Sequence, residues 1–200
     1  MPARSDASHW GTLAKFFHWT TVIAILVQAT IGLVMVELPK RPGTIPVYTF
    51  HKSLGLTIFA FAILRLTWRA FDPHPAYPAT MPHWQVVGAR VGHALLYTLI
   101  FAVPLSGWWF DSATALRPLY WFGLFHIPSL TGGRDDAIKD IAEATHITLF
   151  WILATVAAGH AAIALWHQFH DRDEILRRML PSRRGVRETA NLGAVDDRKE

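Results

Sequence analysis

The chain has 200 residues, of which 52% are apolar and only 17% are charged, and it contains nine tryptophans. Soluble proteins carry about 25% charged residues, so this composition argues against a soluble domain. The chain has no cysteine, which excludes disulfide bonds, thiolate-bound iron–sulfur clusters and thioether-linked haem. The net charge of +4 requires no nucleic-acid partner, because many of the positive residues flank apolar segments.

Four apolar segments are long enough to cross a membrane as helices, since about 20 residues span the hydrocarbon core of a bilayer. We expect spans at about 14–36, 49–70, 89–110 and 144–169. The second span is interrupted by two cations, Lys52 near one end and Arg65 near the other. The sequence therefore predicts an all-α, integral membrane four-helix bundle built from residues 1–181.

The segments between the spans have distinct compositions. Residues 71–88 contain four prolines, which predicts an extended loop. The aromatic stretch 119–125 is expected either to lie on the membrane surface or to fold over a buried site. Residues 134–143 are charged and are expected to begin a helix that runs into the fourth span.

The distribution of lysine and arginine predicts the orientation. Thirteen of the 19 fall on the side of the two termini, so the positive-inside rule places both termini in the cytoplasm. Residues 171–181 are predicted to form an amphipathic juxtamembrane helix. The polar residues 182–200 are predicted to be a disordered cytoplasmic tail.

Four histidines lie at membrane depth, where ionisable groups are usually functional. His146 and His160 are 14 residues apart on the fourth span, which separates them by about 21 Å on nearly the same helix face. His51 matches the depth of His146 near the outer side, and His18 matches His160 near the inner side. A lone histidine at an interface more often only forms hydrogen bonds. Two pairs at two depths, however, are what two bis-imidazole b haems require, so we predict His51 and His146 as ligands of the outer haem iron and His18 and His160 as ligands of the inner one.

Two further residues are candidates for cofactor binding. Arg65 lies 14 residues after His51, on the same helix face, and is expected to pair with a haem propionate or to reach toward the inner headgroups. His93, near the inner end of the third span, could replace a ligand of the inner haem or line a quinone or propionate site. Small residues next to these histidines would leave room for a porphyrin: Gly55, Gly92 and Gly159.

The segments that carry these histidines resemble the bacterial cytochrome b561 family: FFHWTT, HKSLGLTIFAFAILRLTWR, RVGHALLYTLIFAVPLSGWW, RPLYWFGLFHIP and HITLFWILATVAAGHAAIALWHQFHDRDEILRRMLP. The resemblance runs from about Trp10 to Pro181. It implies a multi-pass protein of the bacterial inner (plasma) membrane that binds two haem b and exchanges electrons with ubiquinone or another membrane quinone. The family ligands fall on His18, His51, His146 and His160. The membrane cytochrome b subunits of formate dehydrogenases and hydrogenases look similar, which supports the same pairing.

We therefore expect a respiratory-chain cytochrome that transfers electrons between a periplasmic-side donor, small molecule or protein, and quinone within the lipid. Some family members oxidise superoxide, so a superoxide:ubiquinone oxidoreductase is the alternative, with Lys52, Arg117 and Arg134 steering the anion. A role as membrane subunit of a larger dehydrogenase or hydrogenase complex is less favoured. A proton or metal transporter is disfavoured because the spans lack acidic residues.

The quinone and its protons are expected to meet the protein at the cytoplasmic end. His167 is seven residues after His160 and about 10 Å nearer the cytoplasm. We predict that His167 and Lys15 act at this site, in a polar pocket with Arg69, Arg90 and His93. Interfacial anchoring is the alternative role for His167, and a site near His126 on the outer face is the alternative location.

Overall fold

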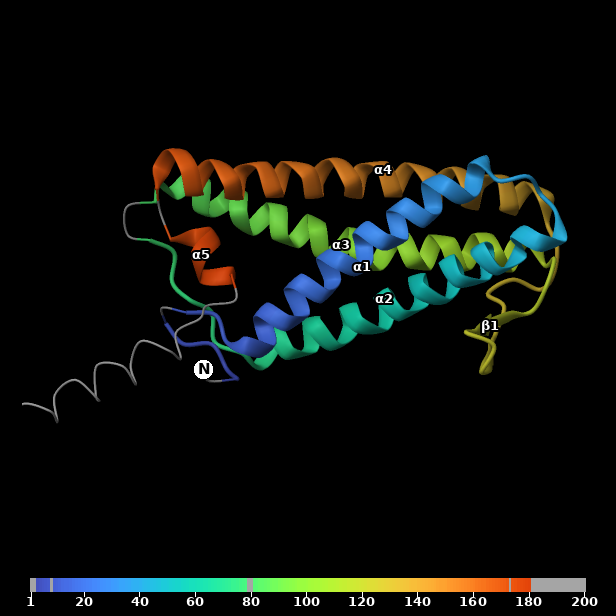
Figure 1. The fold of residues 1–200 in the computed structure, drawn as a ribbon, viewed down its shortest axis with the longest axis horizontal. Helices are drawn as coiled ribbons and strands as arrows, with labels where there is room; N and C mark the ends of the chain where they lie inside the picture. Colours follow the sequence, from blue (N-terminus) through green and yellow to red (C-terminus); the bar gives the residue numbers. More distant parts are fainter. Residues whose placement is uncertain (1–2, 8, 79–80, 173, 181–200) are drawn as a thin grey trace, which may run out of the picture.

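A computed structural model describes residues 3–7, 9–78, 81–172 and 174–180. Four long helices lie lengthwise beside one another (Figure 1): α1 (Thr12–Glu37), α2 (Ile45–Phe71), α3 (His83–Thr114) and α4 (Asp136–Trp166). Each helix is long and apolar enough to cross a membrane. The predicted all-α four-helix fold is therefore confirmed. The predicted tail, residues 182–200, lies outside the described residues.

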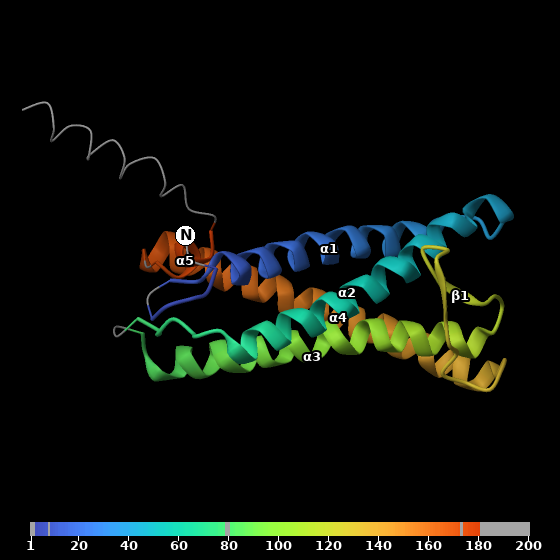
Figure 2. The ribbon, with the colours of Figure 1, turned by 90° about the horizontal axis from the view of Figure 1, so that it is seen from below.

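The two ends of the bundle carry different structures, and we name them accordingly. The N-terminus and the short helix α5 (Ile175–Met179) lie at what we call the terminal end (Figures 1 and 2). An antiparallel pair of strands, β1 (Leu119–Trp121) and β2 (Phe125–Ile127), lies at the hairpin end. A 3-10 turn, η1 (Pro42–Thr44), precedes α2 at the hairpin end as well.

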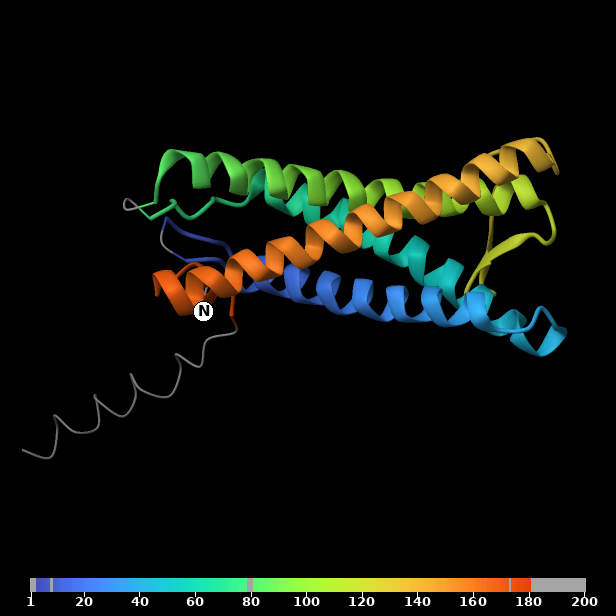
Figure 3. The same ribbon diagram turned by 90° about the horizontal axis from the view of Figure 1, so that it is seen from above.

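Helices α2, α3 and α4 supply the small buried core, whose members are Ile58, Ala62, Leu99, Ile100 and Leu153. Figure 3 shows α4 crossing the bundle diagonally, from the side of α3 at the hairpin end to the side of α1 at the terminal end. Many of the other large apolar side chains are exposed on the outside of the bundle. A large exposed apolar surface is typical of contact with lipid, so this distribution agrees with membrane spans.

The first residues of α3 and α4 can be compared with the predicted helix starts. Helix α3 begins at His83, earlier than the expected start near 89, because the carbonyl of Pro82 accepts the backbone N–H groups of Gln85 and Val86 at 3.0 and 3.3 Å. The expectation of an extended segment up to 88 is therefore wrong for its last residues. Helix α4 begins in the charged segment, as predicted, and Asp135 caps it by accepting the N–H of Ile138 at 3.0 Å.

Helix α4 does not stop at Trp166 but continues as one π-helical turn, η2 (His167–Asp171). Such turns are rare and often occur at functional positions. Arg172 then reverses the chain with a φ of 54°. Of the juxtamembrane helix predicted at 171–181, the described residues form a helix only over α5.

Segments distant in sequence close the terminal end. The residues before α1 fold across it, because Ser5 donates its N–H and its hydroxyl to the buried carboxylate of Asp72 at 2.9 and 2.5 Å. The ammonium of Lys15 donates to the carbonyl of Leu180 at 3.0 Å and thereby ties α1 to the end of α5. Both contacts are local to this end of the bundle.

The aromatic hairpin packs against α2 at the other end. The indole N–H of Trp121 donates to the hydroxyl of Thr57 at 3.0 Å, and the backbone N–H of Phe122 donates to the hydroxyl of fully buried Ser53 at 3.0 Å. The structure therefore supports the second of the two expectations for this stretch, that it folds over buried residues.

Candidate functional site

Two histidines from different helices face each other near the hairpin end. The ring centres of His51 in α2 and His146 in α4 are 6.4 Å apart, and the ring planes are perpendicular. With metal–nitrogen bonds of about 2 Å, two imidazoles on opposite sides of one metal have ring centres about 6 Å apart. The structure thus brings together the two residues predicted for the outer pair, at a separation that suits axial ligands.

His146 is oriented by helix α3. Its Nδ1 lies 3.0 Å from the carbonyl oxygen of Val103 and 3.1 Å from the hydroxyl of Ser106. Because the Ser106 hydroxyl itself donates to Val103 at 2.8 Å, both oxygens accept from the imidazole. The proton is therefore held on Nδ1, and Nε2 carries the lone pair that binds a metal.

Two glycines allow these imidazoles to lie close to the neighbouring helices. A Cβ atom at Gly32 would lie 3.1 Å from Cε1 of His51, and one at Gly107 would lie 3.0 Å from Cε1 of His146. Neither glycine was singled out in the sequence. One usable signal was Pro104 inside the third span, since a proline disturbs the regular helix around it and often marks a special site.

The environment of His51 also fits a bound group. Its Nδ1 is buried and has no hydrogen-bond partner among the described residues. Its backbone carbonyl accepts from the side-chain amide of Gln28 at 2.8 Å, which joins α1 to α2 at this level. A buried nitrogen without a partner is uncommon in folded proteins and marks a position where a further group is expected.

Three histidines and an arginine gather at the second depth, toward the terminal end. The ring centres of His93 and His160 are 5.1 Å apart. A guanidinium N–H of Arg65 donates to Nδ1 of His18 at 3.0 Å, and His18 is within electrostatic range of both other histidines. The inner site therefore contains the predicted ligands His18 and His160 together with His93. His93 lies beside the ring of His160, whereas Nδ1 of His18 accepts from Arg65 in this structure.

The glycines beside these histidines leave space around them. No atom of another described helix lies within 4 Å of a Cβ built at Gly92 or Gly159. Gly55 differs, because a Cβ there would meet the side-chain nitrogen of Gln28 at 3.2 Å.

The residues predicted to form one polar pocket at the terminal end lie in different surroundings. Lys15 is buried and contacts the end of α5, while Arg90 lies over the ring of Tyr77. His167 is buried in the π-helical turn, with its Nδ1 3.0 Å from a carboxylate oxygen of Asp171. None of Lys15, Arg90, His93 and His167 lines the cavity that contains Arg69.

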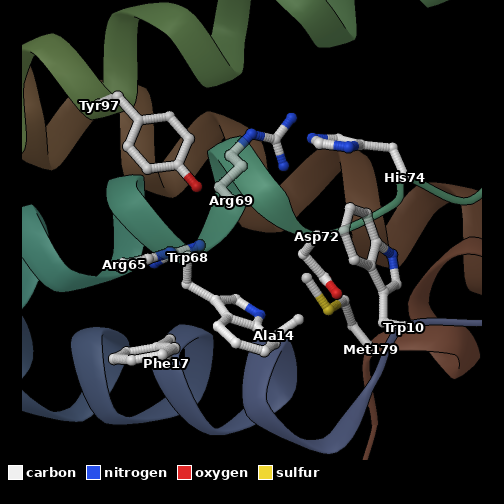
Figure 4. Close-up of a pocket in the computed structure, with 10 residues that line it drawn as sticks. All are labelled: Trp10, Ala14, Phe17, Arg65, Trp68, Arg69, Asp72, His74, Tyr97 and Met179. Atoms are coloured by element: carbon white, nitrogen blue, oxygen red, sulfur yellow. The ribbon is translucent and has the colours of Figure 1, made fainter. Parts of the chain in front are cut away.

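That cavity, which we call the terminal cleft, lies between α1, α2 and α3 (Figure 4). It encloses about 30 Å³. Burial and the neighbouring Arg69 lower the pKa of His74 at its rim below the usual value, so the cleft owes its positive charge to arginine rather than to this histidine. The lining residues are Trp10, Ala14, Phe17, Arg65, Trp68, Arg69, Asp72, His74, Tyr97 and Met179.

Comparison with known proteins shows which family the chain belongs to. Residues 9–182 match the family described as prokaryotic cytochrome b561. The chain belongs to the cytochrome b561 family. It is 33% identical over 181 residues to cytochrome b561 homolog 2 of Escherichia coli (strain K12), covering 90% of this chain and 95% of the relative.

Two further relatives extend the comparison. Cytochrome b561 homolog 1 of Escherichia coli (strain K12) is 25% identical over 170 residues, covering 84% of this chain and 95% of the relative. A Yersinia pestis protein named probable superoxide oxidase CybB is 31% identical over 138 residues, covering 68% of this chain and 75% of the relative.

Membership of the cytochrome b561 family implies a multi-pass bacterial membrane protein that binds haem b and transfers electrons. The residues of this chain fit that cofactor. Imidazoles from different helices lie close together within an apolar helical bundle, which is the ligand type and surrounding that haem b requires.

Proposed function

We propose that this protein is a two-haem b cytochrome that carries electrons across the bacterial inner membrane, between a donor on the periplasmic side and membrane quinone. The facing pair His51 and His146 is the observation that carries the proposal. The second histidine cluster contains His160, which lies 14 residues after His146 on α4, and this cluster supports a second haem. The orientation, with both termini in the cytoplasm, rests on the distribution of lysine and arginine.

In this proposal, His51 and His146 hold the outer haem iron, and His18 and His160 hold the inner one. A haem supplies a one-electron carrier, and the protein supplies its ligands and surroundings. Val103 and Ser106 keep the proton of His146 on Nδ1, which keeps Nε2 available. Ligation by two imidazoles favours electron transfer over the binding of external molecules at iron.

Counting the haems tests the proposal. The reduced-minus-oxidised spectrum of the purified protein should show b-type haem, and acid–acetone extraction with a pyridine haemochrome assay should give two haems per chain. His51→Ala and His146→Ala should remove the same haem. A ratio near one, or haem that remains attached after extraction, would contradict the proposal.

The quinone is proposed to react at the terminal end, with His167 and Lys15 taking part in binding and proton transfer. Supporting this, His167 is buried and lies against Asp171, and a histidine that contacts a carboxylate is a common proton relay. His167→Ala should slow electron exchange between haem and quinone while both haem spectra stay nearly unchanged. If electron exchange with quinone is unchanged in His167→Ala but slower in His126→Ala, the quinone site lies at the hairpin end.

The second candidate activity is superoxide:ubiquinone oxidoreductase, favoured by the similarity to the protein named probable superoxide oxidase. The hairpin end carries less net positive charge than the sequence suggested. Lys52 pairs with Asp111 and Arg134 pairs with Asp136, so carboxylates offset two of the three cations. Reduction of the haem by a superoxide-generating system, abolished by added dismutase, would establish this activity. A subunit role would instead show as a redox partner that copurifies with the chain.

A further inference from the structure

The terminal cleft contains two positive charges that the described residues do not neutralise. Arg65 and Arg69 are one turn apart on α2, and both guanidinium groups lie over the ring of Tyr97, at 5.3 and 5.6 Å. Neither forms an ion pair with a carboxylate of the described chain. The carboxylate that lines the cleft, Asp72, is engaged by Ser5. Two cations at this depth favour binding of an anion.

An indole N–H in the same cleft also needs an acceptor. Nε1 of Trp68 is buried and has no hydrogen-bond partner among the described residues. Trp68 lines the cleft between the two arginines in sequence (Figure 4). An indole nitrogen can only donate, and leaving it unpaired is costly. The partner that satisfies it must therefore present an acceptor oxygen inside the cleft.

The size of the cleft decides which class of ligand fits. Its volume of about 30 Å³ holds about two water molecules, since one water needs roughly 10–15 Å³. A space of that size accommodates one carboxylate or phosphate group. Arginine is well suited to both groups because its planar guanidinium matches their oxygens.

We propose that the terminal cleft binds one oxyanion, a carboxylate or a phosphate, between Arg65, Arg69 and the indole N–H of Trp68. Two sources supply such a group at this depth. One is a propionate of the haem held by the neighbouring histidines, and this source rests on the proposed function. The other is the headgroup phosphate of an anionic phospholipid, which is independent of it.

The test uses the full-length protein with its haem and two cleft variants, Trp68→Phe and Arg69→Gln. Trp68→Phe keeps an aromatic ring but removes the N–H donor. Matched controls change the same residue types outside the cleft: Trp84→Phe, an exposed position on α3, and Arg41→Gln, an exposed position near the hairpin end. Native mass spectrometry measures binding of phosphatidylglycerol, redox titration gives the haem midpoint potentials, and the absorption spectrum reports haem content.

If the source is lipid, both cleft variants should bind phosphatidylglycerol about tenfold or more weakly, as expected for the loss of a bond to a charged group, with unchanged haem potentials. If the source is a propionate, both should lower the midpoint potential of one haem with unchanged lipid binding. Arg69→Gln removes a positive charge, and Trp68→Phe removes a hydrogen bond to the propionate, so in each variant the negative propionate is less stabilised and favours the oxidised haem. Cleft variants that match their controls in both measurements would overturn the inference. A wild-type protein without haem would instead contradict the proposed function, and the lipid measurement would still test the cleft.

Discussion

Replacing Gly107 with alanine should selectively weaken the site at the hairpin end. The added Cβ would lie 3.0 Å from Cε1 and 3.3 Å from Nδ1 of His146, so the imidazole has to move by a few tenths of an ångström. Ligand geometry at a functional site tolerates only about 0.5 Å, and disturbing the surroundings of a metal ligand typically costs 10–100-fold in affinity. That factor corresponds to about 1.4–2.7 kcal/mol of haem-binding free energy.

The helix itself should not suffer from the same change. Alanine has a higher helix propensity than glycine by about 1 kcal/mol, so circular dichroism should show unchanged or slightly higher helicity. The matched control is Gly88→Ala on the same helix, where no described atom lies within 4 Å of the new Cβ. Haem content measured after dilution or gel filtration should fall toward one per chain for Gly107→Ala only.

Two outcomes would refute this reasoning. Full retention of both haems by Gly107→Ala would mean that the close contact with His146 is not important for binding. Equal loss in Gly88→Ala would mean that the effect comes from the helix and not from the site. Gly32→Ala offers a second test on the other side of the pair, because its Cβ would lie 3.1 Å from Cε1 of His51.

Three further predictions concern other contacts. His18→Ala should remove the inner haem while His93→Ala keeps it with a shifted potential, as counted by haemochrome assay and redox titration; the reverse result would make His93 the ligand. Trp121→Phe should destabilise the packing of the hairpin by about 1 kcal/mol and speed its cleavage in limited proteolysis, and an unchanged cleavage rate would show that the indole bond contributes little. Lys52→Ala should lower the free energy of unfolding by about 1–2 kcal/mol, because Asp111 is left buried without its partner. If the double variant Lys52→Ala/Asp111→Ala is no more stable than Lys52→Ala, the ion pair does not explain the loss.

The depth of a residue in the membrane could be predicted from the sequence. The rotation of each helix about its own axis could be predicted only in part. His51 and His146 are brought together because a helix rises by a fixed distance per residue, so equal depth follows from counting residues from the span ends. The same counting placed His93 near His18 and His160. It could not show that His93 lies nearer to His160 while Arg65 reaches His18, because that depends on how each helix is turned about its axis.

Contacts made across the ends of the bundle were not accessible to such reasoning. Lys15, predicted to act at the quinone site, donates to the carbonyl of Leu180, a contact that the sequence did not predict. Its partner is a backbone atom, which leaves no signature in the sequence. The glycines that touch the paired imidazoles, Gly32 and Gly107, are likewise visible only once neighbouring helices are in register, whereas a glycine next to a histidine in sequence is easily noticed.

The way the terminal end is fastened sets an order for assembly of the chain. Ser5 can pair with Asp72 once α2 has been made, but Lys15 contacts Leu180, 165 residues further on. At the hairpin end, by contrast, the partners of Trp121 and Phe122 on α2 already exist when the hairpin is synthesised. During biogenesis the hairpin can therefore pack on α2 before Lys15 has its partner, and the histidine cluster of His18, His93 and His160 is completed only when the last helix, which carries His160, has been inserted.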